Sequence, residues 1–174
     1  MEKKNAFTIT RARPEDAAAL LDYLKIVGGE TDNLSFGAEG VPLAPEEEQA
    51  YLRTQVDSPD HVQYLARVDG ELIGTASLNR KPGRMRHRGV FGISLKRAWW
   101  GCGAAGALME AILAFARAND FEQLNLEVRS SNARAIRLYE KYGFRKLCTF
   151  PNFFKLNGAY IDFDLMNLEL GAEA

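Results

Sequence analysis

Apolar and polar residues along the chain follow two periods, and the change from one to the other marks the elements. A period of two residues predicts a strand, and a period near 3.6 residues predicts a helix. The alternating pattern predicts strands over 7–11, 62–68, 71–78, 89–95, 123–128, 144–154 and 159–168. The helical pattern predicts helices over 14–27, 45–56, 104–117 and 133–141.

The stretch from Gly89 to Arg117 organises the chain, because it joins a buried strand to a helix through a loop of small residues. No bulky side chain occurs between Gly101 and Gly106, so a ligand can approach the backbone closely. The helix that follows leaves its first N–H groups unpaired and carries partial positive charge at that end. This arrangement predicts an anion site, most naturally for a phosphate or pyrophosphate.

Glycine turns and one crossover predict how the strands connect. Asp69-Gly70 and Asn157-Gly158 each favour a β-hairpin. The strand–helix–strand unit over 89–128 predicts two parallel neighbours, and Gly28-Gly29 is expected to end the first helix. The predicted fold class is α/β with a mixed sheet: antiparallel N-terminal strands, a central βαβ unit and a C-terminal β-hairpin, in a single domain over 1–174.

The string GCGAAG at 101–106 also fits the G-x-G-x-x-G pattern of dinucleotide-binding folds. Glu127 stands near the place of their ribose-binding acid. In such folds the first glycine closes the strand at once, whereas Lys96 to Trp100 intervene here. No further βα alternation follows to build a doubly wound sheet. An NAD-dependent oxidoreductase is therefore the weaker interpretation.

Composition limits the partners and the compartment. With 26% charged residues and a formal net charge of −1, the 174-residue chain has no overall field that favours nucleic acid or a membrane surface. The N-terminal segment has no apolar run typical of a signal peptide, and no segment is long enough to span a bilayer. Cys102 and Cys148 make neither a disulfide framework nor a metal site. We expect a cytoplasmic, metal-free protein whose basic turn over 80–88 is a solubilising hairpin tip.

The longest irregular stretch, 30–45, carries the acids Glu30, Asp32 and Glu39. A loop of this length in a compact domain is often functional. Its carboxylates favour a cationic ligand, such as a polyamine. The acids at 46–48 are more simply explained as the first turn of the next helix.

Two local patterns carry a family resemblance. The first is WGCGAA at 100–105, and the second is NARAIRLY at 132–139. Together they resemble the GCN5-related N-acetyltransferases, whose acetyl-CoA loop is Arg/Gln-x-x-Gly-x-Gly/Ala and whose second motif is Asn-x-x-Ala-x-x-Leu-Tyr. Trp100 departs from the Arg or Gln of the family, a change that phosphate binding by backbone N–H groups should tolerate. The likeness covers nearly the whole chain, beginning with RPED at 13–16.

The resemblance implies that acetyl-CoA binds where the strand before the loop splays away from its parallel neighbour. Tyr139 matches the general acid that protonates the departing CoA thiolate, and Asn132 matches a residue whose amide contacts the cofactor. From the residues alone, Tyr139 is a core tyrosine, and Ser130, Ser131 or Asn132 is the helix N-cap. The residues that the resemblance assigns to acetyl-CoA binding are Ile93, Ser94, Leu95, Trp100, Gly101, Cys102, Gly103, Ala104, Ala105, Gly106, Asn132 and Tyr139.

The general base is the least defined part of the resemblance. Many relatives carry Glu just before the G-I-S of the strand, but Val90-Phe91 stands there. Glu30 and Glu127 are the candidates, and water can relay the proton. His87 is set aside because it lies in a basic turn. Cys102 occupies a free position of the loop and is expected to be inert rather than an acyl-carrying nucleophile.

The predicted function is direct, acetyl-CoA-dependent acetylation of a small primary amine, with a polyamine or another small cationic amine as first candidate. An amino acid and a protein N-terminus or lysine stay open as acceptors, since a fold does not define a substrate. A non-catalytic acyl-CoA-binding module also stays open. No nucleic acid, membrane or metal is expected to take part, and a homodimer is left open.

Overall fold

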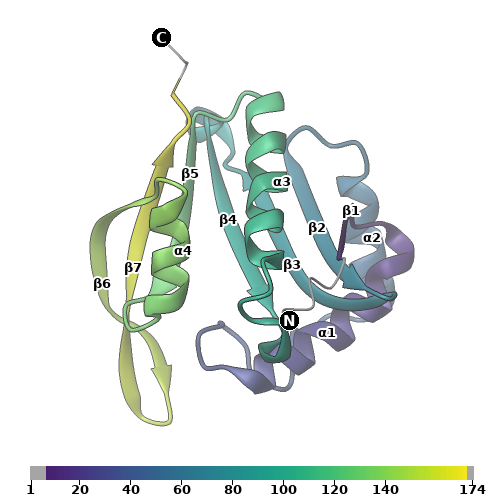
Figure 1. Ribbon diagram of the computed structural model, residues 1–174, viewed down its shortest axis with the longest axis horizontal. Coiled ribbons are helices and arrows are strands. Elements are labelled where there is room, and N and C mark those ends of the chain that lie inside the picture. Colours follow the sequence, from purple (N-terminus) through teal and green to yellow (C-terminus); the bar gives the residue numbers. More distant parts are fainter. Residues whose placement is uncertain (1–6, 172–174) are drawn as a thin grey trace.

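A computed structural model describes residues 7–171, so that 1–6 and 172–174, including the first residues of the N-terminal segment discussed above, lie outside the described residues (Figure 1). The strands are β1 Thr8–Arg11, β2 His61–Val68, β3 Glu71–Arg80, β4 Arg88–Leu95, β5 Gln123–Arg129, β6 Arg145–Leu156 and β7 Ala159–Glu169. The helices are α1 Ala17–Glu30, α2 Pro45–Gln55, α3 Ala104–Ala118 and α4 Ala133–Lys141, with single 3-10 turns at Pro14–Asp16, Gly83–Met85 and Arg97–Trp99.

All of these strands belong to one mixed sheet in the order β1-β2-β3-β4-β5-β7-β6. Neighbouring strands are antiparallel except β4 and β5, which are parallel. The crossover through α3 and the C-terminal hairpin β6–β7 are those expected from the pattern. The predicted fold class is therefore confirmed.

Different helices cover the two faces of the sheet. The hydroxyl of Tyr23 in α1 lies 2.9 Å from that of Ser94 in β4. Leu95, the next residue, points to the opposite face, where it and Leu108 of α3 both lie against Gly74. Thus α1 and α2 cover one face and α3 and α4 the other (Figure 1).

A separate hydrophobic core lies under each helical layer. Leu108 and Ile112 are fully buried between α3 and the sheet, and Leu20, Leu52 and Leu65 are buried under α1 and α2. Burial of each such side chain stabilises the folded state by about 1.5–3 kcal/mol. The two cores therefore hold the middle of the sheet firmly, including the point where β4 and β5 meet.

The expectation that Gly28-Gly29 ends the first helix is wrong, because α1 continues to Glu30. The glycines serve close packing instead. A β-carbon at Gly28 would overlap the carbonyl oxygen of Gly37, and one at Gly29 would lie 3.3 Å from the β-carbon of Ala38. The loop after α1 therefore folds back along the last turn of the helix.

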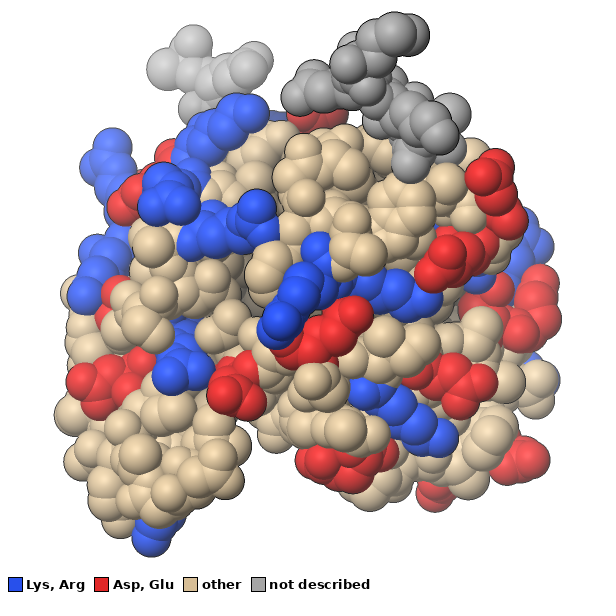
Figure 2. Space-filling model, turned by 60° about the horizontal axis from the view of Figure 1, so that its bottom comes forward, with Lys and Arg blue, Asp and Glu red and all other residues tan. Residues whose placement is uncertain are grey.

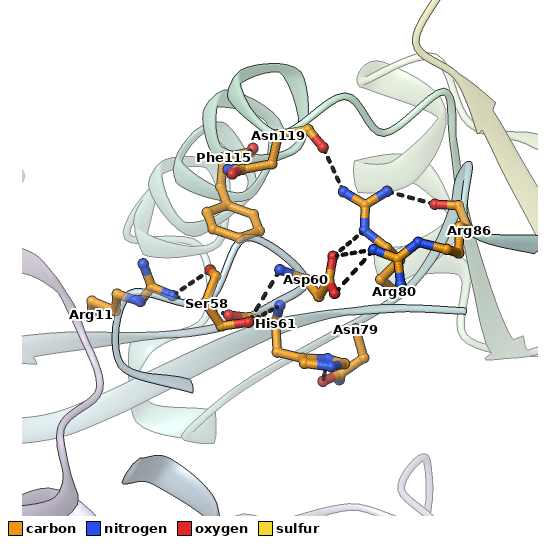
Figure 3. A network of polar contacts seen from close by, with 9 residues as sticks. All are labelled: Arg11, Ser58, Asp60, His61, Asn79, Arg80, Arg86, Phe115 and Asn119. Atoms are coloured by element: carbon orange, nitrogen blue, oxygen red, sulfur yellow. Dashed lines mark hydrogen bonds and ion pairs between the residues drawn. The ribbon is translucent and has the colours of Figure 1, made fainter. Parts of the chain in front are cut away.

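The basic turn over 80–88 is not simply a solubilising tip, since one of its arginines is structural. Arg80 Nε lies 2.6 Å from Asp60 Oδ1, and the Arg80 side chain is only 9% exposed. Its guanidinium lies 3.8 Å from the ring centroid of Phe121 and donates to the carbonyls of Arg86 and Asn119 (Figure 3). Arg80 thereby ties β3 to β2 and to the end of α3.

Asp60 is the carboxylate at the centre of this network. Its burial opposes ionisation, but the hydrogen bonds and positive charges of its two arginines outweigh that effect and lower the pKa of Asp60 below its ordinary value. On the neighbouring strand, Arg11 donates to the carbonyls of Ser58 and His61 at 2.9 and 3.1 Å (Figure 3). Paired arginines thus fasten this end of the sheet.

Candidate active site

β4 and β5 pair over only the first part of their length. Their register runs from Arg88↔Gln123 to Val90↔Asn125, beyond which β4 stays with β3 and β5 with β7. The two strands therefore part toward their C-terminal ends, which confirms the predicted splay. A cavity of about 1120 Å³ opens in the gap.

The cavity is lined from both faces of the sheet. We call the part lined by α4 and by residues 99–107 except Cys102 and Ala104 the loop half. We call the part lined by Thr31, 33–35, the β6–β7 hairpin and the α1-facing side of β5 the hairpin half. Figure 2 shows one face of the molecule hollowed between the hairpin and the rest, with acidic and basic side chains interspersed around the hollow. The gap between β4 and β5 joins the two halves.

Backbone groups dominate the loop half. Gly101 and Gly103 have φ values of +83° and +93°, in the left-handed region that favours glycine. The helix α3 starts at Ala104, and the N–H groups of 104–106 have no backbone acceptor among residues 7–171. A β-carbon at Gly103 would meet nothing within 4 Å, so the loop leaves open space over those donors. This geometry suits an anion.

Two basic side chains of α4 that sequence reasoning missed also line the loop half, Arg134 and Lys141. The Arg134 guanidinium lies 5.0 Å from the ring centroid of Trp100, beside the glycine loop. Their spacing of seven residues places both on one side of a helix and would have indicated a second source of positive charge. Together with the free N–H groups, they fit the phosphates of acetyl-CoA.

The residues assigned to acetyl-CoA are not all placed alike. Ile93–Leu95 line the gap, but the Leu95 carbonyl already accepts a 3.0 Å hydrogen bond from Trp100 Nε1. Gly101, Gly103, Ala105 and Gly106 line the loop half. Cys102 is exposed and Ala104 is buried, and neither side chain belongs to the lining.

Asn132 is the N-cap of α4 and also lines the cavity. Its Oδ1 accepts a 3.3 Å hydrogen bond from Ala135 N. The cap uses only the oxygen, so the side-chain amide nitrogen, which donates to nothing within 7–171, is available to a ligand.

Tyr139 lines the cavity from α4 and is 6% exposed. Its ring meets Phe91 edge-on, with centroids 6.1 Å apart. Burial raises the pKa of the Tyr139 phenol above its ordinary value of 10.0, so the group keeps its proton at neutral pH. The other cavity tyrosine, Tyr142 at the end of α4, has its hydroxyl 3.3 Å from Gly106 O and 3.2 Å from Glu110 Oε1, and its single proton can be donated to either.

Side chains, rather than backbone groups, dominate the hairpin half. Glu127 and Arg129 alternate along β5 and therefore share the face that looks toward α1. Glu127 is exposed and Arg129 half-buried, and both line the cavity. Aromatic rings of the hairpin complete this wall, and sequence reasoning did not single them out: Phe153, Phe154 and Phe163.

The acids of the loop after α1 lie outside the cavity lining. Glu30 Oε2 accepts a 2.7 Å hydrogen bond from Arg97 N, and its carbonyl accepts one from the Arg97 side chain. Glu39 Oε1 accepts one from Gly37 N at 2.8 Å, which lowers the pKa of Glu39. These two carboxylates hold backbone in place, so the observation that favoured a polyamine loses its basis.

Within residues 7–171, no group of three or more His, Cys, Asp or Glu side chains is placed to hold a metal ion. No helix of that range is both long and apolar enough to cross a membrane. Cys102 and Cys148 are exposed free thiols.

Comparison with known proteins identifies the family to which the chain belongs. Residues 31–144 match the model of the Acetyltransferase (GNAT) family. Over 109 residues, 61% of this chain and 67% of the relative, the chain is 33% identical to the L-amino acid N-acetyltransferase AaaT of Escherichia coli (strain K12).

Solved structures agree with this match. A GNAT-family acetyltransferase from Streptococcus pneumoniae superposes with a TM-score of 0.91 at 29% identity, covering 95% of this chain and all (100%) of that one. The structure of yncA from Salmonella typhimurium with its cofactor acetyl-CoA has a TM-score of 0.83 at 22% identity over 98% and 97% of the two chains, a likeness of fold.

Proposed function

Because the chain belongs to the GNAT acetyltransferase family, in which acetyl-CoA supplies the acetyl group, we propose that it transfers acetyl directly to a small primary amine. One observation carries this proposal: a single cavity passes through the sheet between β4 and β5. Its loop half is suited to the phosphates of acetyl-CoA, and its hairpin half carries the carboxylate of Glu127. The amine therefore enters from the face opposite the anion-binding loop.

We assign the proton donor to Tyr139. A phenol whose pKa is raised by burial stays protonated at neutral pH and can give its proton to a leaving thiolate. Its place in the cavity wall supports this role. The amide nitrogen of Asn132 and the N–H groups at the start of α3 would position the co-substrate.

The ammonium form of an amine must lose a proton before it attacks. Among the described residues that line the cavity, the carboxylates are Glu127 and Glu110, and only Glu127 lies in the hairpin half. We propose Glu127 as the group that attracts the ammonium and accepts the proton, directly or through water. Glu30 stays the second candidate for the general base, although it lies outside the cavity lining and its carboxylate accepts a hydrogen bond from Arg97 N.

The relative in Escherichia coli is named for L-amino acids, which supports an amino acid as acceptor more than the polyamine. A protein N-terminus stays the second candidate. The cytoplasmic location, and the lack of nucleic-acid and membrane partners, stay predictions from composition.

The test is thiol release from acetyl-CoA across a panel of amines, with the acetylated product identified by mass spectrometry. The panel contains neutral amino acids, spermidine, simple alkylamines and a short peptide with a free N-terminus. We expect turnover with at least one small amine. Calorimetric binding of acetyl-CoA without turnover of any acceptor would support a non-catalytic acyl-CoA-binding module instead.

A further inference from the structure

Arg129 differs from the other half-buried arginines of the described chain. It lines the cavity, and its guanidinium forms no hydrogen bond or ion pair with any group among residues 7–171. Its Nε is buried without a hydrogen-bond partner, as are those of Arg11 and Arg80, but those two side chains have hydrogen-bond partners at other atoms. The other half-buried arginines are all paired: Arg11 with carbonyls, Arg67 with Asp16, Arg80 with Asp60 and Arg88 with Asn125.

A guanidinium that loses water without gaining a partner is costly. Arg129 belongs to β5, and its register partner is Phe163 of β7, so neighbouring strands hold its backbone in place. Arg129 lines the hairpin half of the cavity, where the terminal nitrogens of its guanidinium have no partner among residues 7–171. An arginine fork is best satisfied by a carboxylate.

We propose that Arg129 binds the carboxylate of the acceptor, which makes the acceptor an α-amino acid. This inference rests on the proposed acetyl transfer. Glu127 lies two residues before Arg129 on the same face, about 7 Å away along the strand. Two long side chains from these positions can converge on the ammonium and the carboxylate of one zwitterion, and the two do not pair with each other.

The aromatic wall defines the third point of contact. The ring centroid of Phe163 lies 4.2 Å from that of Phe154 and 4.9 Å from that of Phe153, and Phe153 is 38% exposed. An apolar or aromatic side chain can stack on these rings. The hairpin half therefore selects amino acids with large apolar side chains. It disfavours polyamines, because Arg129 repels a second positive charge.

The test compares L-phenylalanine with phenethylamine, which lacks only the carboxylate, in the wild-type protein and in Arg129→Gln. We expect wild-type kcat/KM to be about 10–100-fold higher for phenylalanine, the range of a charged hydrogen bond. Arg129→Gln should remove most of that preference and leave kcat/KM for phenethylamine within about twofold of the wild-type value. Arg137→Gln, which removes an exposed charge outside the cavity lining, is the matched control.

Arg129→Lys keeps the charge but not the fork and should recover only part of the preference. If Arg129→Gln does not fold, wild type is compared with Arg129→Lys, and a preference that is unchanged in that variant would overturn the assignment. Equal wild-type rates for the two amines, or a preference that survives in folded Arg129→Gln, would overturn the assignment. If no amine is acetylated, the proposed acetyl transfer is wrong. Calorimetric binding of phenylalanine to CoA-saturated protein then tests the carboxylate site by itself. Weaker phenylalanine binding in Arg129→Gln upholds the carboxylate site, and unchanged binding rejects it.

Discussion

The two halves of the cavity are built in opposite ways. In the loop half, the backbone N–H donors come from neighbouring residues at the start of one helix, and Arg134 and Lys141 of α4 add positive charge. The hairpin half is assembled from Thr31, 33–35, β5 and the β6–β7 hairpin, and side chains form its surface. The backbone donors of the loop half are local in sequence, whereas the surface of the hairpin half exists only after folding.

This difference has a functional consequence. A backbone site depends little on side-chain identity and suits a co-substrate that a whole family shares. A side-chain site changes with single substitutions and suits an acceptor that differs between relatives. Substitutions in the loop half should therefore affect acetyl-CoA, and those in the hairpin half the amine.

The largest effect is expected at Gly103. Gly103→Glu forces a side chain onto a left-handed φ of +93° and places a carboxylate beside the phosphate donors. Repulsion of about 4 kcal/mol corresponds to a loss of CoA affinity on the order of 1,000-fold, measured by calorimetry. Gly70→Glu, at φ +84° in a distant turn with nothing within 4 Å, controls for backbone strain. Similar losses in both variants would argue against an anion site at the loop.

Removing the hydroxyl of Tyr139 tests the junction of the two halves. Tyr139→Phe should lower kcat about 100-fold, the low end of general-acid contributions, and leave CoA affinity nearly unchanged. Because burial raises the pKa of Tyr139 above 10.0, the wild-type rate should show no loss from phenol ionisation below about pH 10. Tyr142→Phe is the control, and a larger loss in that variant would move the acid to Tyr142.

Glu127→Gln keeps the shape of the hairpin half and removes its negative charge. We expect kcat/KM for the amine to fall about 30-fold at pH 7, less than a full general-base contribution because water can relay the proton. The loss should shrink as rising pH supplies free amine. Glu30→Gln still accepts a hydrogen bond from Arg97 N and should change the acceptor's KM by less than about threefold. A larger loss in Glu30→Gln than in Glu127→Gln would place the acceptor site next to α1 instead.

The smallest effect belongs to Asp60, far from both halves. Asp60→Asn should lower Tm at pH 7 by less than about 4 °C and leave kinetics unchanged. The native pKa of Asp60 lies below its ordinary value of 3.8, so its stabilisation is full above that value and is lost as pH falls through the native pKa. The difference in Tm between wild type and variant should therefore shrink progressively as the pH falls below 3.8. A kinetic effect would show that the scaffold and the cavity are coupled.

The same contrast explains what the sequence could predict. Hairpin turns, the crossover and the helix that begins directly after the glycine loop are signalled by neighbouring residues, and these elements are confirmed. Gly28-Gly29 was misinterpreted because the reason for these glycines is the approach of Gly37, which no local pattern reports. Arg129 and the rings of the hairpin meet only through strand pairing between β5, β7 and β6. Their joint role was therefore not visible along the chain.

The claim that one cavity joins both halves through the split sheet is tested most directly by a conjugate. CoA is linked through an acetyl bridge to the nitrogen of the amine that the wild-type protein acetylates fastest, and its binding is measured by calorimetry. A continuous cavity predicts that the conjugate binds about 100-fold more tightly than CoA, because the second contact becomes intramolecular. A conjugate that binds no more tightly than CoA would contradict the account.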